Sequence, residues 1–535
     1  MRSAHVTVKP DSDYYERSIA RTADRGGNGE PARTVVAFSA KNRRIAFVAA
    51  AGLVIIAGSA VRWSFLDYPM RYDETWTYLR FTSKSPSYIA AHYIPANHVL
   101  HSLFVRFTIA FAGNSPAALR TPAFIAGLLL IPASGWLAWA QFRRRDVVLL
   151  AMLAAAASSQ LVEYSANSRG YTWFVLFAVV ECVITTGLID SPRRKAFWAL
   201  WGIVGALGAY TLPLMIYPVS GLGTALVIYT LSRPRGGPDR RAANRGLLLG
   251  ALVCGTVTLA LYSPILIQQG LNETYASRVT SLKVYDDYFA THGPMLLAVW
   301  KGWARHSNLV WQITLVLGFG VFLGTVIRRA QPRHLVPAAM LLGLPPAIVV
   351  HGVPIAPPGW MFLLPLFLTC SMYGIVMLVS IVARHVHGSI VSASIAGTVL
   401  LAGAFSLASV SRQEYLSSWE HELVDIERIL DECEAFGRDR CALVTRYVPS
   451  KPYYVGRRGW GRLSPPHAPD VERVFIAVGT LRSLDDLWHE GIRGYGEYGP
   501  PRIWRSFSRS TLYAADRTTH SEGAANRRIS SVLSP

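Results

Sequence analysis

Long apolar stretches recur along most of this chain, and short polar segments that are mostly basic separate them. Each stretch has about 20 residues, which is enough for a helix to cross roughly 30 Å of hydrocarbon. The pattern predicts about eleven membrane-spanning helices, at residues 45–65, 117–140, 147–165, 171–190, 196–212, 214–231, 246–267, 308–327, 335–351, 360–383 and 389–409. We therefore expect an all-α polytopic membrane protein.

The basic residues between these stretches predict an orientation, because Lys and Arg stay on the cytoplasmic side. If the first span runs outward, every basic cluster falls on that side: 41–44, 143–145, 193–195, 233–245 and 328–333. Two long loops, 66–116 and 268–305, then face outward, as does the chain after residue 410. We expect a multi-pass protein of the plasma (inner) membrane with a cytoplasmic N-terminus.

The predicted membrane topology depends on residues 97–112, because they form an apolar stretch that is not counted as a span. At 100° per residue, leucines and phenylalanines share one face of a helix, whereas His98, His101 and Arg106 share the other. This pattern predicts an amphipathic helix lying in the membrane interface. Counting it as a span would place Arg143–Arg145 outside and invert every later loop.

The two ends of the chain differ from the membrane domain, which we assign to residues 43–410. Residues 1–42 predict a disordered cytoplasmic tail, and 516–535 a second disordered tail. Residues 411–515 predict a small extracytoplasmic α/β domain, with a helix in 414–436, strands in 441–448 and 471–479, and a helix starting at Ser483. Cys433 and Cys441 in this domain can form a disulfide if it lies outside; two free thiols are the alternative.

The composition agrees with a membrane protein, since 51% of the 535 residues are hydrophobic and only 16% are charged. The net charge of +20 does not indicate nucleic-acid binding, because most basic residues lie in the short loops that set orientation. In the C-terminal domain, aromatic and basic side chains can stack on sugars or meet phosphates, with ordinary packing as the alternative: Tyr453, Tyr454, Arg457, Arg458 and Trp460.

Asp73 and Glu74 are the leading candidates for chemistry, because they follow the first span at the membrane surface. Adjacent residues do not share a helix face. We expect Asp73 to point into a cavity as a general base, and Glu74 to support it by capping or by pairing with Arg71 or Arg80. The alternative for Asp73 is a solvated loop carboxylate.

Three further side chains leave alternatives open. His98 and His101 can ligate a divalent metal with Asp73 or Glu74, or simply lie at the headgroup boundary. The sequence thus allows a metal but requires no cofactor. Glu181 lies about mid-depth in a predicted span, where a carboxyl group is costly. It serves a proton or ion path, or it is a protonated hydrogen-bonding group.

Four motifs in order, DE at 73–74, NHVLHSLF, AGNSPAALRTPAFIAGLLL and VEYSANSRGYTWF, resemble the GT-C superfamily of membrane glycosyltransferases. The similarity is to the bacterial branch related to protein mannosyltransferases and to the aminoarabinose transferase of lipid A. It covers about residues 45–215 and weakens toward 385. The resemblance implies a GT-C-like helical bundle, a catalytic acidic residue at Asp73, a sugar donor on a polyprenyl phosphate, and inversion at the anomeric centre.

The leaving phosphate of such a donor needs cations. The resemblance implies Arg169, followed by Tyr171, as a phosphate-binding pair, and His98 as a cavity residue. Further candidates on the outer rim are Arg120, Arg278, Lys283 and Arg305; interface anchoring is the alternative for each. His101 and Asn167 are also expected to line the cavity. The sequence departs from the family pattern at Asn167, where an acidic residue is common, and at PPGWMFLLP, which lacks an Arg.

The resemblance and the outward-facing carboxylates together predict an inverting glycosyltransferase. It would move a sugar from a polyprenyl-phosphate donor to an envelope glycan, lipid or protein acceptor on the outer face. The expected partners are this donor, the acceptor and membrane lipids. Two alternatives stay open: a lipid-linked-sugar transporter or flippase, and a non-catalytic protein of envelope assembly.

Overall fold

The computed structural model describes residues 40–279, 288–351, 355–385, 389–412, 423–445, 450–460, 463–466, 468–478, 484, 487, 498–508 and 510–517. The chain divides into two units after Val48, and the second, from Ala49 onward, holds the candidate site. Most of the two predicted disordered tails lies outside the described residues.

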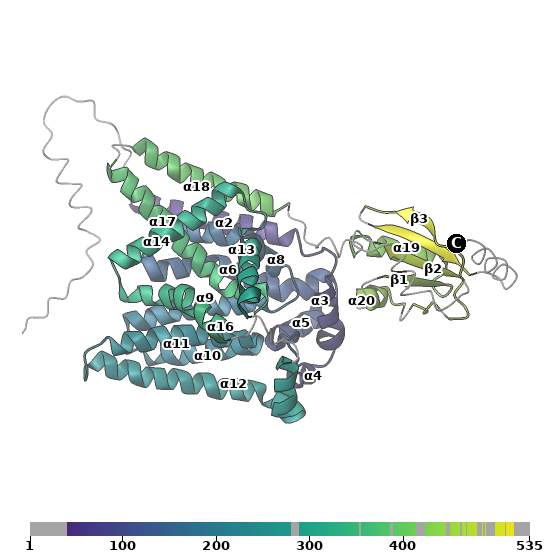
Figure 1. Cartoon of the computed structure of the whole chain (residues 1–535), viewed down its shortest axis with the longest axis horizontal. Coiled ribbons are helices and arrows are strands. Elements are labelled where there is room, and N and C mark those ends of the chain that lie inside the picture. Colours follow the sequence, from purple (N-terminus) through teal and green to yellow (C-terminus); the bar gives the residue numbers. More distant parts are fainter. Residues whose placement is uncertain are drawn as a thin grey trace, which may run out of the picture. The chain divides into compact units, whose positions relative to one another are not determined.

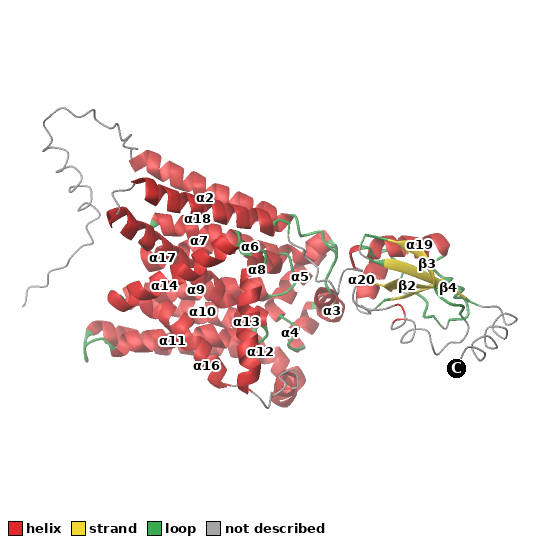
Figure 2. Ribbon diagram, turned by 45° about the horizontal axis from the view of Figure 1, so that its top comes forward, coloured by secondary structure: helices red, strands yellow, loops and turns green. Residues whose placement is uncertain are grey.

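Helices make up most of the second unit (Figures 1 and 2). The long ones are α2 (Ala40–Trp63, which begins in the first unit), α6 (Pro116–Phe142), α7 (Arg145–Ala156), α9 (Tyr171–Asp190), α10 (Lys195–Thr211), α11 (Ile216–Leu231), α12 (Pro238–Val279), α13 (Tyr288–Ala304), α14 (Leu309–Arg328), α17 (Leu364–His385) and α18 (Ser389–Val410). Shorter ones are α3 (Tyr72–Thr77), α4 (Pro86–Ala91), α5 (Val99–Ala112), α8 (Ser159–Ser165), α15 (Leu335–Pro337) and α16 (Leu344–His351). The hydrocarbon of a membrane contains no water that could bond to the backbone. The N–H and C=O groups of such apolar segments must therefore bond to each other, as they do in helices.

Seven helices among the described residues are long and apolar enough to cross a membrane, and the bent pair α7 and α8 makes an eighth if it counts as one span. The multi-pass membrane character predicted from the sequence is confirmed. The predicted number of about eleven spans is not confirmed.

The predicted span 147–165 is not one helix. It is bent by 61° between α7 and α8, and a buried arginine of α2 occupies the break. Arg62 donates to the carbonyl oxygens of Ala155 and Ala156 at 3.1 and 3.3 Å, and its Nε lies 3.2 Å from the Ser165 hydroxyl. The guanidinium thus satisfies carbonyls that the broken helix leaves unpaired.

Helix α5 is amphipathic, as the sequence predicts, and its 14 residues extend only about 21 Å. Its apolar face is open, with Phe107 and Phe111 exposed by 68% and 77%. Its polar face, including His101 and Ser102, is buried in the protein. A helix with exposed phenylalanines and buried histidines suits an apolar surrounding; its place in the interface stays a prediction.

The loops that the sequence assigns to the cytoplasm meet through ion pairs. Asp190 binds Arg143 at 3.2 Å and Arg333 at 2.8 Å, and Arg193 binds Asp239 at 2.8 Å. The predicted alternation of the loops between two ends of the bundle therefore agrees with the structure at this end. Which end faces the cytoplasm stays a prediction.

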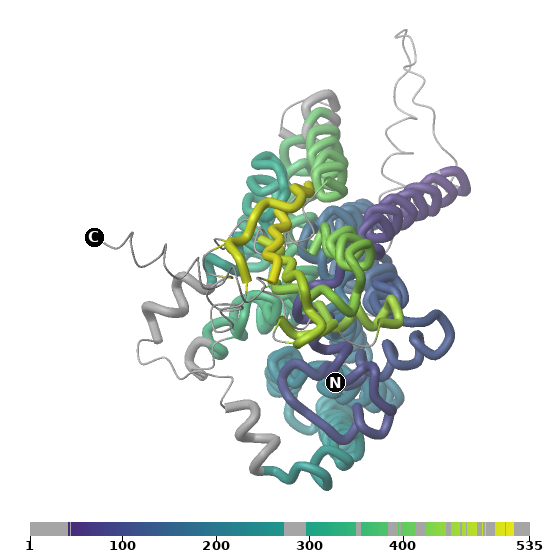
Figure 3. Tube along the Cα trace, turned by 90° about the vertical axis from the view of Figure 1, so that its right-hand side faces the viewer, coloured from purple at the N-terminus to yellow at the C-terminus, as the bar shows by residue number. Residues whose placement is uncertain are grey.

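The C-terminal domain contains a four-stranded sheet in the order β1-β2-β4-β3 (Figure 3, yellow and light green). Strands β1 (Cys441–Val444) and β2 (Arg473–Val478) are parallel and lie within the predicted strands. Strands β3 (Arg502–Ser506) and β4 (Thr511–Asp516), which run antiparallel to their neighbours, are not predicted by the sequence. Helices α19 (Ile426–Phe436) and α20 (Ser450–Arg457) complete the described domain. The predicted helix from Ser483 falls outside the described residues, apart from Leu484 and Leu487.

The cysteine pair of this domain is not oxidised in the structure. Cys433 and Cys441 are free, buried thiols, and the Cys441 thiol donates to the carbonyl oxygen of Arg438 at 3.8 Å. The expected disulfide is therefore absent here, although the two thiols lie as neighbours.

Candidate active site

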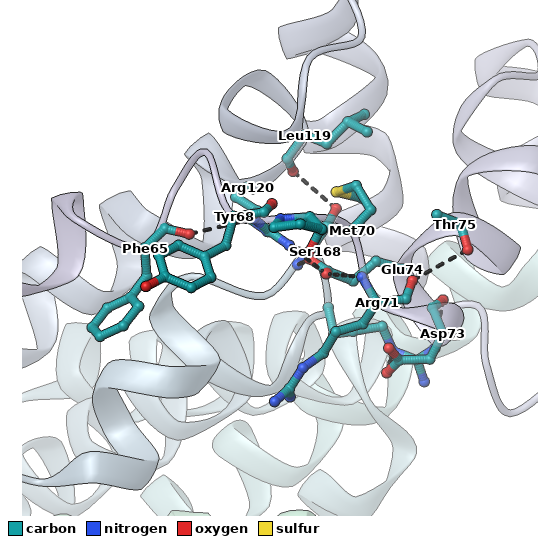
Figure 4. Close-up of polar contacts among 12 residues, drawn as sticks. Phe65, Tyr68, Met70, Arg71, Asp73, Glu74, Thr75, Leu119, Arg120 and Ser168 are labelled. Carbon is teal, nitrogen blue, oxygen red and sulfur yellow. Dashed lines mark hydrogen bonds and ion pairs between the residues drawn. The ribbon is translucent and has the colours of Figure 1, made fainter. Parts of the chain in front are cut away.

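Glu74 forms the centre of a buried polar network at one end of the bundle (Figure 4). Its carboxylate accepts hydrogen bonds from Arg120 Nε and Nη2 at 2.9 and 2.7 Å, and from the backbone amides of Ser168 and Arg71 at 2.6 and 2.8 Å. Burial alone would raise the pKa of Glu74, but the Arg120 charge and these four hydrogen bonds outweigh it and lower the pKa. Glu74 is thus a fixed carboxylate whose two oxygens accept four hydrogen bonds.

Arg120 holds the chain that leads from α2 to α3. Besides the Glu74 carboxylate, it donates to the carbonyl oxygens of four residues, at 2.6 to 3.3 Å: Phe65, Leu66, Tyr68 and Pro69. The guanidinium is fully buried, and these contacts use its Nε and both Nη atoms. The sequence placed Arg120 on the rim as a phosphate ligand; the structure instead engages its donors inside the protein, because the loop carbonyls need partners there.

Asp73, the next residue in the chain, has the opposite environment. Its side chain is 44% exposed, and Oδ2 lies 3.9 Å from Nε of Arg169. Helix α3 separates the two neighbouring carboxylates, because consecutive helical residues point about 100° apart. Glu74 caps α3 by accepting the Arg71 amide, as the sequence allows, and its ion-pair partner is Arg120 and not Arg80. The catalytic roles of the two carboxylates stay a prediction.

Arg169 approaches Asp73 from the segment between α8 and α9. Its Nη1 donates to the Thr77 hydroxyl at 3.1 Å and reaches the Asp73 carbonyl oxygen at 3.4 Å. Burial lowers the pKa of Arg169, but the Asp73 charge and the nearby Tyr171 more than reverse this, so the pKa is raised. The guanidinium also lies 5.9 Å from the Tyr171 ring. Arg169 and Tyr171 are thus brought together beside the exposed carboxylate.

The backbone fixes the tautomer of His98. Its Nδ1 accepts the amide N–H of Gly170 at 2.7 Å, so the proton of the neutral ring lies on Nε2. Burial and the charge of Arg169 hold the pKa of His98 well below its usual range. Gly170 permits this contact, since a Cβ there would lie 2.8 Å from the His98 Cβ. His98 therefore presents one N–H donor, and its Nε2 has no partner among the described residues.

Further buried polar atoms surround this donor. Both ring nitrogens of His101, Oδ1 of Asn167 and Nε of Arg169 are buried without a hydrogen-bond partner among the described residues. Burial and Arg169 lower the pKa of His101 to about 3, so this ring is neutral at physiological pH. Unpaired polar atoms are costly inside proteins. Arg169 Nε lies 3.9 Å from Asp73 Oδ2, and the charge of Arg169 acts on both histidines, so these groups form one site that a polar ligand or water completes.

The residues described by the structure contain no group of three or more metal-ligating side chains close enough to hold an ion. His98 has one nitrogen occupied by the Gly170 amide, which leaves only Nε2 for a metal. A divalent ion at these histidines thus finds no support in the described part of the chain.

The other predicted cations pair with a carboxylate or lie outside the described region. Lys283 is outside the described residues, and the Arg278 side chain is not described either. Arg305 lies 3.9 Å from Glu163, which also binds Arg71 at 2.6 Å. In the C-terminal domain, Tyr453 and Tyr454 are buried, and Arg458 binds three carboxylates, which agrees with packing as their role.

Several residues that matter to the site were not singled out by the sequence. Thr77 and Ser168 contribute through hydrogen bonds to Arg169 and Glu74, and Glu163 through its ion pair with Arg71. Only Glu163, a carboxylate inside the VEYSANSRGY motif, carried a signal of its own. The contributions of Thr77 and the Ser168 amide depend on contacts across about 90 residues of chain, which no local pattern reveals.

An apolar cavity of about 560 Å³ lies between α10, α11 and α12. Tyr93, Pro213 and Met215 line it, as do Gly205, Val219 and Cys254. Gly205 faces Glu181, Val219 and Cys254, since a Cβ on Gly205 would lie 3.1 Å from the Glu181 carboxylate oxygen, 3.1 Å from Val219 and 3.4 Å from the Cys254 sulfur. Glu181 is fully buried and neither oxygen has a hydrogen-bond partner among the described residues.

Comparison with solved structures gives the fold. ArnT from Cupriavidus metallidurans bound to undecaprenyl phosphate superposes with a TM-score of 0.57 at 12% sequence identity, over 89% of this chain and 98% of that one. The chain has the fold of ArnT. The apo state of the same protein matches with a TM-score of 0.55 at 14% identity, over the same shares of the two chains. The archaeal oligosaccharyltransferase AglB from Archaeoglobus fulgidus matches with a TM-score of 0.47 at 11% identity, over 88% of this chain and 74% of AglB.

The likeness to ArnT confirms the fold that the sequence predicts, a polytopic helical bundle with a small C-terminal α/β domain. No protein-family model and no curated protein sequence matches the chain. At these identities the likeness establishes the fold alone.

Proposed function

We propose that the protein is an inverting glycosyltransferase that moves a sugar from a polyprenyl-phosphate donor to an acceptor on the outer face of the membrane. The observation that carries this proposal is the pairing of an exposed carboxylate, Asp73, with the buried cation Arg169 beside unpaired polar atoms. ArnT, whose fold the chain shares, has been solved with undecaprenyl phosphate.

The Asp73 carboxylate takes the proton of an acceptor hydroxyl, and the hydroxyl oxygen then forms a bond to the anomeric carbon. The bond between that carbon and the phosphate oxygen breaks, and its electron pair leaves with the phosphate. Attack from the side opposite the leaving group inverts the anomeric centre. Glu74 does not exchange protons, because four donors occupy its oxygens; it fixes the backbone on which Asp73 stands.

Arg169 balances the charge that develops on the leaving phosphate. Its Nε is buried and has no hydrogen-bond partner among the described residues, so it is free to donate to a phosphate oxygen. The Nε2–H of His98 is a second fixed donor. The ring of Tyr171 adjoins both donors, at 4.9 Å from the His98 ring and 5.9 Å from the Arg169 guanidinium. Such preorganised donors need no rearrangement when charge develops.

The isoprenoid tail of the donor needs an apolar groove within the bilayer. The cavity between α10, α11 and α12 has the required lining, and Thr211 at the end of α10 lies against Gly170 of the site. We propose that part of the tail lies in this cavity.

Replacing Asp73 by Asn tests the proposal, because the amide cannot accept the proton. We expect transfer from a polyprenyl-phosphate sugar to disappear in reconstituted vesicles, while expression and thermal unfolding match the wild type. Asp67→Asn, an exposed carboxylate of the same segment, is the control and should keep full activity. Wild-type activity in the Asp73 variant would refute the role of this residue.

A flippase is the second candidate, and Glu181 is the observation that favours it. A buried carboxyl group within a span is a functional hypothesis by default. The same vesicles separate the two functions: a transferase forms glycosylated product, whereas a flippase only moves the donor across the bilayer, and Glu181→Gln should impair only the latter.

A further inference from the structure

The C-terminal domain contacts the segment that carries the candidate base. The hydroxyl of Tyr454 in α20 accepts the backbone amide of Met70 at 2.6 Å, three residues before Asp73. The Met70 side chain is fully buried, in one apolar cluster with Ile429 and Leu430 of α19. The core of the domain therefore extends onto the first loop of the bundle.

The peptide group between Pro69 and Met70 is held from both sides. Its carbonyl oxygen accepts Arg120 Nη2 at 3.0 Å, and its amide N–H donates to Tyr454. One partner belongs to α6 of the bundle and the other to the C-terminal domain. A peptide plane that is bonded at both ends has little freedom to rotate, and Asp73 follows it within one turn of helix.

Tyr454 is suited to accept this bond. Burial raises the pKa of its hydroxyl, so the group is neutral at physiological pH, and its oxygen accepts the Met70 N–H through a lone pair. Without that oxygen the Met70 amide would be left in a buried place, where an unpaired N–H is costly.

The neighbouring tyrosine provides a matched comparison. Tyr453 donates its hydroxyl proton to the carbonyl oxygen of Asn114 at 2.8 Å, and its ring packs on Tyr78 at 5.3 Å. This contact also joins the domain to the bundle, but it reaches the connection between α5 and α6. The two hydroxyls thus share one interface and differ in which segment they hold.

We propose that Tyr454 is a positioning residue: through the Met70 amide, the C-terminal domain fixes the loop that presents Asp73. This inference rests on the proposed function, in which Asp73 is the base. The domain then acts on turnover without touching donor or acceptor. The donor-binding groups Arg169, Tyr171 and His98 belong to other segments of the chain, although Arg169 also donates to the Thr77 hydroxyl of α3.

Hydrogen exchange tests whether Tyr454 fixes the loop, without any assay of activity. In Tyr454→Phe, the amides of residues 66–74 should exchange faster by about tenfold, the loss expected for one buried hydrogen bond. In Tyr453→Phe the same amides should keep their protection. Unchanged exchange of 66–74 in Tyr454→Phe, or equal acceleration in both variants, would overturn the proposal.

Steady-state kinetics of sugar transfer test whether the fixed loop affects turnover. Tyr454→Phe should lower kcat by about tenfold, with the KM for the donor within about twofold of wild type, since only the base is displaced. Tyr453→Phe should lower kcat less. Tyr498→Phe, which removes a hydrogen bond to Pro466 inside the domain, controls for the fold and should match wild type.

The outcomes separate this inference from the proposed function. A wild-type protein that transfers no sugar defeats the proposed function, and the proposed effect of Tyr454 on turnover falls with it. An active wild type with an equally active Tyr454→Phe, or with a change confined to the KM of the donor, defeats only the positioning role.

Discussion

At the scale of residues, Asp73 and Glu74 are neighbours in the chain but lie in opposite surroundings. Glu74 is buried with four donors, whereas Asp73 is 44% exposed beside Arg169. Helical geometry explains the division, because consecutive side chains point about 100° apart, so one faces the protein interior when the next is exposed. The buried pair of Glu74 and Arg120 also ties three separated segments together, so its main contribution is to the integrity of the site.

Arg120→Met tests this contribution. The change leaves the Glu74 carboxylate and four loop carbonyls without their partner, which should cost about 3 to 5 kcal/mol. Thermal unfolding in detergent should show a much lower midpoint. The matched control is Arg193→Met, since the Arg193–Asp239 pair is exposed by 66% and 44% and such pairs contribute about 0 to 1 kcal/mol. Equal midpoints for both variants would contradict the assignment.

At the scale of elements, close helix crossings shape the bundle. Helices α14 and α17 meet at Gly318 and Gly374, where a Cβ on Gly374 would lie 1.7 Å from the Gly318 carbonyl oxygen. Small residues at such crossings allow the backbones of membrane helices to approach. The crossing packs α17 into the core of the bundle, to which α7 and α9 also belong.

Gly374→Ala should therefore push the two helices apart and destabilise the protein, because the obstacle is backbone and cannot swing aside. Gly320→Ala in α14 is the control: nothing lies within 4 Å of its added Cβ. There we expect a neutral or slightly stabilising effect of up to about 1 kcal/mol, since alanine favours helix over glycine. The thermal unfolding midpoints of both variants test this prediction. An unchanged midpoint for Gly374→Ala would mean that the two helices lie farther apart than described.

At the scale of the whole molecule, sidedness decides whether the site can meet a lipid-borne donor. Asp73 and the basic cluster at 143–145 lie in loops that the threading places on opposite faces. Nucleotide sugars are confined to the cytoplasm, so an outward-facing Asp73 implies a sugar that arrives on a lipid.

Impermeant thiol reagents test this orientation. Asp73→Cys should be labelled in intact cells, and Arg145→Cys only after the membrane is opened. The unmodified protein gives the background, since four of its five cysteines are buried. Labelling of position 73 from the cytoplasmic side alone would end the case for an outer-face transferase.

The sequence by itself determined the class of the molecule: a multi-pass helical membrane protein, an amphipathic segment at 97–112, a separate α/β region after residue 410, and Asp73 with Glu74 as the leading carboxylates. Each of these follows from local information, because hydrophobic length, 3.6-residue periodicity and charge are read within about 20 residues. The break after Ala156 escaped this approach, since the arginine that satisfies it lies on another helix.

Only the tertiary structure decided the partners. It turned Arg120 inward to Glu74, fixed the His98 tautomer through Gly170, and bonded Tyr454 to Met70 across 384 positions of chain. It also added β3 and β4, whose short segments carry little pattern of their own. The physical reason is that a hydrogen bond depends on which atoms approach within about 3 Å, and that approach is set by the packing of elements far apart in the sequence.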